Sequence, residues 1–262
     1  MLVSNVDYFL SWVVHFLLIT ARISVLFVIT PLLARQSIPA MAKIGLSILL
    51  AAIVINFAPP PEVYPYDNLF SLAFAVLSEF MAGLVIGFVT LLFFNIVYTA
   101  AHVMDMQIGF SMAQIFDVSA GGQVAVTSAL LNFILIVVFI LSGAFTQLIA
   151  MMARTFEVIP VGAGVLRLEV AELALLLFIR CFEIALMVAM PLVASALILE
   201  VALGVIVRTA PQMNVFVVGI PLKVLLGLIV LLMMVPVFTS FSNVIFTNMF
   251  DAIDQMVRGL IP

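Results

Sequence analysis

The chain has 262 residues, of which 66% are hydrophobic and only 8% are charged, and its formal net charge is −4. A soluble domain carries roughly 25% charged residues, so a chain with so few polar groups cannot cover a water-facing globule. The nine lysines and arginines are scattered singly, which excludes a nucleic-acid-binding patch. We therefore predict an integral membrane or membrane-complex protein.

Six apolar segments follow one another along the chain, and each is predicted to be helical. A helix needs about 20 apolar residues to cross a hydrocarbon core of ~30 Å. Pro191 and Pro236 interrupt the last two segments, so each is expected at a kink or at the tip of a hairpin. The six segments cover about residues 8–33, 42–58, 69–100, 127–153, 172–207 and 214–250.

The charges of the connecting loops do not support six simple membrane crossings. Two cations predict that loop 34–43 is cytoplasmic by the positive-inside rule. Continued alternation would put loop 101–126 inside, where it has no lysine or arginine, and loop 154–171 outside, where it has two arginines. The predicted fold is therefore all-α: one domain over 1–262 of long kinked helices and helical hairpins, packed largely against other protein, without a soluble domain.

Three helical stripes combine a charged residue with glycines at intervals of four. Charges are costly in lipid, and small residues allow close approach of helix backbones, so these stripes are predicted to be subunit interfaces of an oligomer. A proton or ion relay is the alternative. The stripes are Glu79, Gly83 and Gly87; Glu200, Gly204 and Arg208; and Gly219, Lys223 and Gly227.

Ion pairs are expected to neutralise several of these charges. Lys223 is a candidate partner for a carboxylate, and Arg22 is predicted to pair across a helix contact. Arg180 and Glu183 are candidates for a pair within one helix. The sequence has no Walker loop, HExxH, GxSxG or CxxC motif, so we expect no enzymatic activity, catalytic residue, bound metal or cofactor.

The stretch "MDMQIGFSMAQIFD" (104–117) stands between two strongly apolar segments and contains no lysine or arginine. Its composition is typical of an amphipathic connector at the membrane surface, with methionine and phenylalanine covering apolar neighbours. A movable seal is the other interpretation, because methionine adapts to varied shapes and hydrophobic constrictions can close a pore by dewetting.

Several stretches resemble, in this order, the FliR/SctT family of type III secretion export-gate proteins, which includes flagellar biosynthetic protein FliR and its injectisome counterparts. The last of them is the most specific, because Pro-Gln-Met-Asn-Val-Phe precedes Gly-Ile-Pro-Leu-Lys. Val118 is a departure, since many relatives have proline there. The stretches are "TPLLARQSIPAMAKIGL" (30–46), "EFMAGLVIGF" (79–88), "MQIGFSMAQIFD" (106–117), "RTFEVIPVG" (154–162) and "VRTAPQMNVFVVGIPLKVLLG" (207–227).

The resemblance implies a non-enzymatic subunit of the flagellar export gate, in the bacterial inner membrane at the flagellar basal body. Such a chain is similar to a fused FliP and FliQ pair. As one copy it assembles with FliP-like and FliQ-like subunits, and a FlhB-like protein wraps the outside. Unfolded export substrates pass through the centre. A secondary transporter or channel for a small solute is the alternative, and a purely structural scaffold is a third possibility.

The resemblance also implies that a loop at about 104–123 acts as a plug in the lumen. Gly109 and the bulky side chain after it would form the tip, and a glycine pair would form a hinge. The predicted plug residues are Met106, Ile108, Gly109, Phe110, Ser111, Met112, Ile115 and Phe116, with Gly121 and Gly122 as the hinge.

Overall fold

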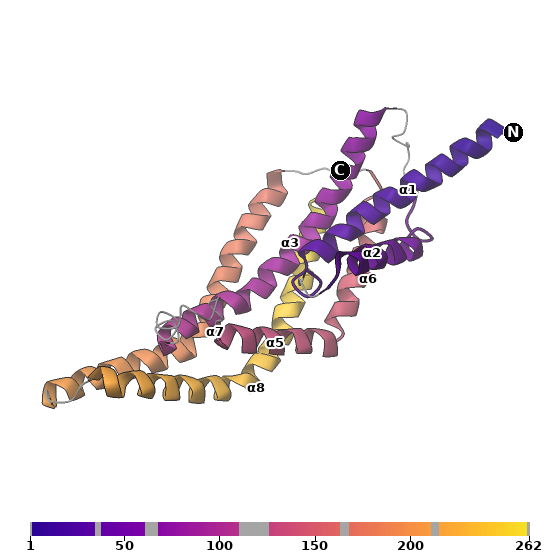
Figure 1. Cartoon of the computed structure of the whole chain (residues 1–262). Coiled ribbons are helices and arrows are strands. Elements are labelled where there is room, and N and C mark those ends of the chain that lie inside the picture. The colour runs from indigo at the N-terminus through magenta and orange to yellow at the C-terminus, as the bar shows by residue number, and fades with distance from the viewer. Residues whose placement is uncertain are drawn as a thin grey trace. The chain divides into compact units, whose positions relative to one another are not determined.

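A computed structural model describes residues 2–34, 38–60, 68–109, 126–162, 168–210 and 215–260, with side chains from residue 8 and, in the last range, from residue 217. All regular elements in these ranges are helices (Figure 1). The predicted all-α class with long helices is therefore confirmed, and no soluble domain is evident in the described ranges. The helices are α1 (Leu2–Ile29), α2 (Ala40–Val54), α3 (Leu69–Ile108), α5 (Val126–Leu141), α6 (Ala144–Val158), α7 (Leu168–Thr209) and α8 (Val215–Arg258).

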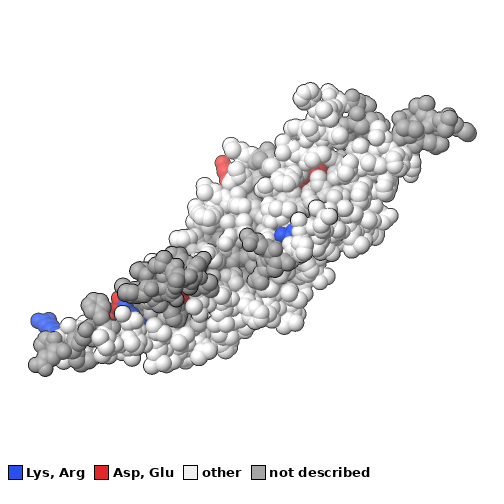
Figure 2. Space-filling model, viewed as in Figure 1, with Lys and Arg blue, Asp and Glu red and all other residues white. Residues whose placement is uncertain are grey.

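Four of the described helices, α1, α3, α7 and α8, are long and apolar enough to cross a membrane. A fifth span is possible if α5 and α6 are counted together, although they are bent by 65°. Helix α2 has only 15 residues, which is short for a span. The face of the molecule in Figure 2 fits this composition, because most of it is uncharged and acidic or basic groups stand isolated.

The segment predicted as one helix at 127–153 is two helices that meet at Gly143. This residue has φ +77°, a left-handed conformation that glycine adopts without the steric cost of a side chain. The chain therefore breaks between α5 and α6 although its composition stays apolar. Pro191 lies inside α7, and Pro236 lies inside α8. Neither proline therefore lies at the tip of a hairpin, and that alternative is wrong. A kink at each proline stays a prediction.

The chain divides into two compact units, each described by itself. Unit 1 consists of Met1–Leu92, Gly143–Leu177 and Thr247–Pro262. Unit 2 consists of Phe93–Ser142 and Phe178–Phe246. Unit 1 therefore contains α1, α2, the first part of α3 and α6, whereas unit 2 contains the end of α3, α5, and the parts of α7 and α8 nearest their connection.

Helices α1 and α3 pack closely in unit 1 because α3 carries two glycines on the contact face. A side chain at Gly83 would collide with the backbone carbonyl of Arg22, and a Cβ at Gly87 would lie 3.0 Å from the Cβ of Ile29. The subunit interface predicted on the stripe of Glu79, Gly83 and Gly87 is therefore, in the structure, a contact within the chain. The stripe does permit close helix packing, but its partner is α1.

Unit 2 is held by aromatic and small-residue contacts. The ring of Phe139 on α5 meets those of Phe94 on α3 and Phe246 on α8 edge to face, at centroid distances of 5.2 Å and 5.1 Å. Such aromatic pairs add to the free energy gained from burial alone. On α8, a Cβ at Gly227 would lie 2.5 Å from Cγ1 of Ile108. Glycine there lets the end of α3 lie directly on α8.

Candidate functional site

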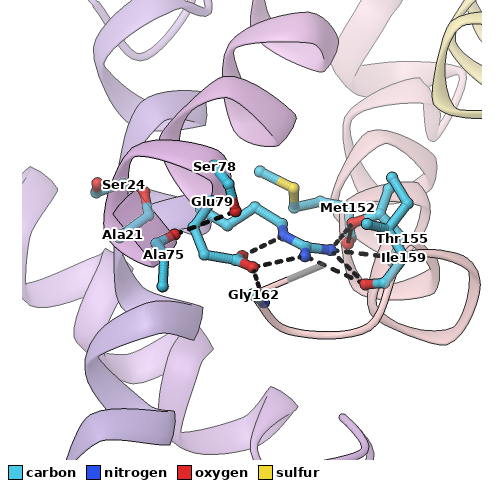
Figure 3. Close-up of polar contacts among 10 residues, drawn as sticks. Ala21, Ser24, Ala75, Ser78, Glu79, Met152, Thr155, Ile159 and Gly162 are labelled. Atoms are coloured by element: carbon cyan, nitrogen blue, oxygen red, sulfur yellow. Dashed lines mark hydrogen bonds and ion pairs between the residues drawn. The ribbon is translucent and has the colours of Figure 1, made fainter. Parts of the chain in front are cut away.

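Two polar arrangements, one in each unit, contain most of the predicted site residues that the structure describes. The first is a buried ion pair between α1 and α3 in unit 1 (Figure 3). Arg22 Nε lies 2.6 Å from Oε2 of Glu79, and Arg22 Nη2 lies 3.0 Å from Oε1. Both side chains have 0% exposed surface. The parallel hydrogen bonds form the bidentate arrangement in which arginine holds a carboxylate most firmly.

The remaining donors of Arg22 reach the end of α6. Nη1 donates to the carbonyl of Thr155 at 3.1 Å, and both Nη1 and Nη2 donate to the carbonyl of Ile159 at 3.2 Å. The carbonyls at the end of a helix carry partial negative charge, so the guanidinium stabilises this end of α6. The carbonyl of Thr155 also accepts from the backbone N–H of Ile159 at 2.8 Å. Its carbon also lies 4.1 Å from the ring centroid of Phe156, a cation–π distance.

The carboxylate has a second donor beyond the arginine. The backbone N–H of Gly162 donates to Oε1 of Glu79 at 2.7 Å. The ion pair thus ties α1 and α3 to the turn that follows α6. A guanidinium does not lose its proton at accessible pH, so this arrangement favours a structural role over a proton relay. The prediction that Arg22 pairs across a helix contact is confirmed.

The second arrangement is a cavity of about 410 Å³ in unit 2. It brings together two predicted sets that are far apart in the sequence: the start of the plug and the stripes of α7 and α8. Nζ of Lys223 lies 2.5 Å from Oε1 of Glu200, and these side chains are 28% and 42% exposed. The lining residues are Met106, Gln107, Ile108, Gly109, Glu200, Leu203, Gly204, Val207, Gly219, Ile220 and Lys223.

The predicted plug begins later than the loop assigned to about 104–123. Helix α3 continues to Ile108, because residues 88–108 contain no glycine or proline. The next residue, Gly109, has φ +92°. Met106 is 72% exposed, whereas Ile108 is 1% exposed and packs on α8. The remaining predicted plug and hinge residues lie outside the described residues: Phe110, Ser111, Met112, Ile115, Phe116, Gly121 and Gly122.

The other predicted charges lie on exposed helix surface. Arg208 is exposed in the last turn of α7. Arg180 and Glu183 are both exposed on α7, but no ion pair joins them in the part of the chain that the structure describes. The pair predicted within this helix is therefore wrong. Among the described residues, no group of three or more histidine, cysteine or acidic side chains could hold a metal ion.

The sequence did not single out the acceptors of Arg22. Thr155 and Ile159 accept from Arg22 with backbone carbonyls, and only Thr155 adds a side-chain oxygen, at 3.3 Å. Gly162 donates its backbone N–H to Glu79 and so gives no side-chain signal either. The one indication was that these residues belong to "RTFEVIPVG", a stretch with a specific resemblance. Asp105 was also missed as a contact residue, although it lies within the stretch that drew attention.

The fold and these two arrangements define an α-helical membrane protein in which two ion pairs join charges on apolar helices. The model of the family described as "Bacterial export proteins, family 1" matches residues 13–249, and the chain belongs to this family. It is similar to flagellar biosynthetic protein FliR of Bacillus subtilis (31% identity over 250 residues, 94% of each chain). It is also similar to the proteins of that name from Escherichia coli K12 (26% over 258 residues, 97% of each chain) and Aquifex aeolicus (29% over 222 residues, 85% of each).

These similarities cover the full set of helices and not one isolated motif. The family match begins within α1 and ends within α8. The chain is therefore a membrane component of the bacterial flagellar export apparatus.

Breaking the buried pair should destabilise unit 1 strongly. Arg22→Met or Glu79→Gln should each cost about 3–5 kcal/mol, because the remaining charge is left buried without its partner. The double variant should cost less than the sum of the two, as expected for residues in direct contact. Thermal unfolding of the purified protein in detergent measures these effects.

The exposed pair of Arg258 and Asp254 on α8 is the matched control, since its atoms lie 2.8 Å apart, close to the 2.6 Å of the buried pair. Removing it should cost under ~1 kcal/mol because exposed pairs are screened by water. Equal losses at the two pairs would contradict the role given to burial.

Proposed function

We propose that the chain is a non-enzymatic subunit of the flagellar protein export gate in the bacterial inner membrane. One copy forms, with FliP-like and FliQ-like subunits, the channel through which unfolded flagellar substrates cross, and a FlhB-like protein lies outside it. The family membership and the names of the relatives support this proposal. The structural observation that carries it is the half-exposed pair of Glu200 and Lys223 on otherwise apolar helices.

The helices that carry this pair are largely uncovered within the chain. In the most apolar window of α7 and of α8, only 17% of the residues are buried, against 67% in α3. Apolar side chains on such faces are stable in contact with lipid. A charged pair there is unfavourable, because it would lose its hydration. We infer that the face with Glu200 and Lys223 meets partner subunits or the aqueous channel, and that other faces meet lipid.

The cavity at this face supports the plug as part of the same proposal. Met106, 72% exposed, and Gly109 line the cavity together with Glu200 and Lys223. Methionine side chains adapt to varied shapes, and the positive φ of Gly109 lets the chain turn away from α3 immediately after it ends. The proposed plug therefore leaves α3 at the edge of the proposed partner-facing surface.

The cavity also favours one other function. A volume of about 410 Å³ falls within the range of pockets that hold small molecules, roughly 300–1,000 Å³. A secondary transporter or channel for a small solute would use such a pocket. Purification in mild detergent separates the two, because a gate subunit comes with two small hydrophobic partner proteins and a carrier comes alone.

Deleting residues 109–114 should leave assembly intact but make the closed gate leak ions or small molecules, because the proposed seal is removed. Collapse of the membrane potential and entry of a small dye into cells measure the leak. A replacement of the same length by glycine and serine separates loss of the apolar side chains from shortening of the chain. Unchanged membrane tightness in both variants would overturn the plug.

Gly204→Leu should reduce co-purification with partner subunits roughly tenfold, since overpacking a close contact costs about 1–3 kcal/mol. A Cβ at Gly204 would have no atom of the described residues within 4 Å outside its immediate helical neighbours, so we expect the leucine to leave the fold of unit 2 intact. Gly45→Leu on α2 is the control, because Gly45 also has open space around it. Full recovery of partners with the Gly204 variant would remove this face from the subunit interface.

A further inference from the structure

Asp105 is a carboxylate buried one turn before the end of α3. It has 2% exposed surface, and its neighbours along the helix, Met104 and Ile108, have 0% and 1%. An ionised carboxylate in such apolar surroundings is costly unless it accepts hydrogen bonds. The ion pairs of the described residues involve other acids, so no cation in the described part of the chain forms an ion pair with Asp105.

The described partner of Asp105 is a backbone amide at the start of α5. The N–H of Thr127 donates to Oδ1 of Asp105 at 3.2 Å, across 22 residues of sequence. Thr127 is the second described residue of α5. Amides in the first turn of a helix have no carbonyl partner within it, and they lie at the positive end of the helix dipole. The carboxylate of Asp105 on α3 therefore accepts a hydrogen bond from an amide at the start of α5. In other helices the side chain of the N-cap residue accepts this bond.

This hydrogen bond holds the end of α3 next to the start of α5. It joins the last turn of α3 to the first described turn of α5. Bringing two segments together across many residues has an entropic cost, which a hydrogen bond between them helps to offset. Oδ2 of Asp105 and Oγ1 of Thr127 are also buried and have no hydrogen-bond partner among the described residues, so the single bond to the amide is the only described polar tie here.

We propose that Asp105 is a positioning residue of the export gate: its carboxylate holds the end of α3 to the start of α5, and the tightness of the closed gate depends on this tie. The proposal rests on the proposed function for the meaning of the tie, because the predicted plug lies between these two helices in the sequence. The tie itself is a property of unit 2 alone. It can therefore be tested independently of the gate.

The test measures the distance between the two ends in the assembled membrane complex. Spin labels are attached to cysteines at Met106 and Val126, both exposed, in a Cys181→Ala background, and pulsed electron resonance gives the distance distribution. With Asp105 present, one narrow distribution is expected. Asp105→Ala removes the acceptor, and we expect the narrow peak to be lost. Asp105→Asn keeps an acceptor oxygen at the same place, and we expect it to keep the peak.

A second variant acts on the donor. Thr127→Pro removes the amide hydrogen, and proline is tolerated in the first turn of a helix, so we expect the same loss of the narrow peak with Asp105 intact. Asp254→Ala, at an exposed acid on α8, is the control and should leave the distribution unchanged. If Asp105→Ala fails to assemble, Thr127→Pro still tests the hydrogen bond.

Leak and export are then measured with the unlabelled variants. Loss of the narrow peak with a leaking gate supports the proposal in full. Loss of the peak with a tight gate supports the tie and overturns the plug as the function of the connection. An unchanged narrow peak in both Asp105→Ala and Thr127→Pro overturns the proposal, whatever the gate does.

Discussion

The structure of unit 1 depends on the burial of one charge pair. Arg22 and Glu79 have no exposed surface, and hydrogen bonds to Thr155, Ile159 and Gly162 supplement those within the pair. The partners lie 57 and more than 130 residues away from Arg22 in the sequence. A buried pair is tolerated when its geometry is good and its remaining donors are satisfied. Because these hydrogen bonds must all form, α1, α3 and the end of α6 are held at fixed positions relative to one another.

The close approach of α1 and α3 follows from the same constraint. The bidentate contact needs the two helix backbones near each other, and Gly83 supplies the space, because its missing side chain would occupy the place of the Arg22 carbonyl. Charge and glycine on one helical stripe are therefore two parts of a single packing solution. In unit 2, the charge and the glycine of the α7 stripe are not buried against another helix of the chain in this way. Glu200 and Lys223 are partly exposed, and a Cβ at Gly204 would have no atom of the described residues within 4 Å.

The sequence was sufficient for the helical class and the family. Composition and hydropathy report burial in a membrane or complex, and the string around Pro-Gln-Met-Asn-Val-Phe is long enough to indicate a family. It was also sufficient for Arg22 as a partner across helices. These predictions succeeded because each depends on residues that are close together in the sequence or on the chain as a whole.

The remaining features depend on three-dimensional neighbours. A stripe such as Glu79, Gly83 and Gly87 shows that a helix packs closely, but not whether its partner belongs to the same chain. The break at Gly143 depends on a backbone dihedral within an apolar run, and the continuation of α3 to Ile108 depends on the absence of a breaker. The backbone groups that hold Arg22, such as the carbonyl of Ile159, carry no side-chain signal at all.

The central claim is that the cavity of unit 2 faces the path of the exported protein. A photo-crosslinking residue at Met106, in a gate arrested with a substrate in transit, tests it most directly. Phe57 is a suitable comparison, since it is 77% exposed at the end of α2. The account predicts adducts with the substrate from Met106 and none from Phe57. Adducts from Met106 with lipid alone, while the substrate occupies the gate, would contradict it.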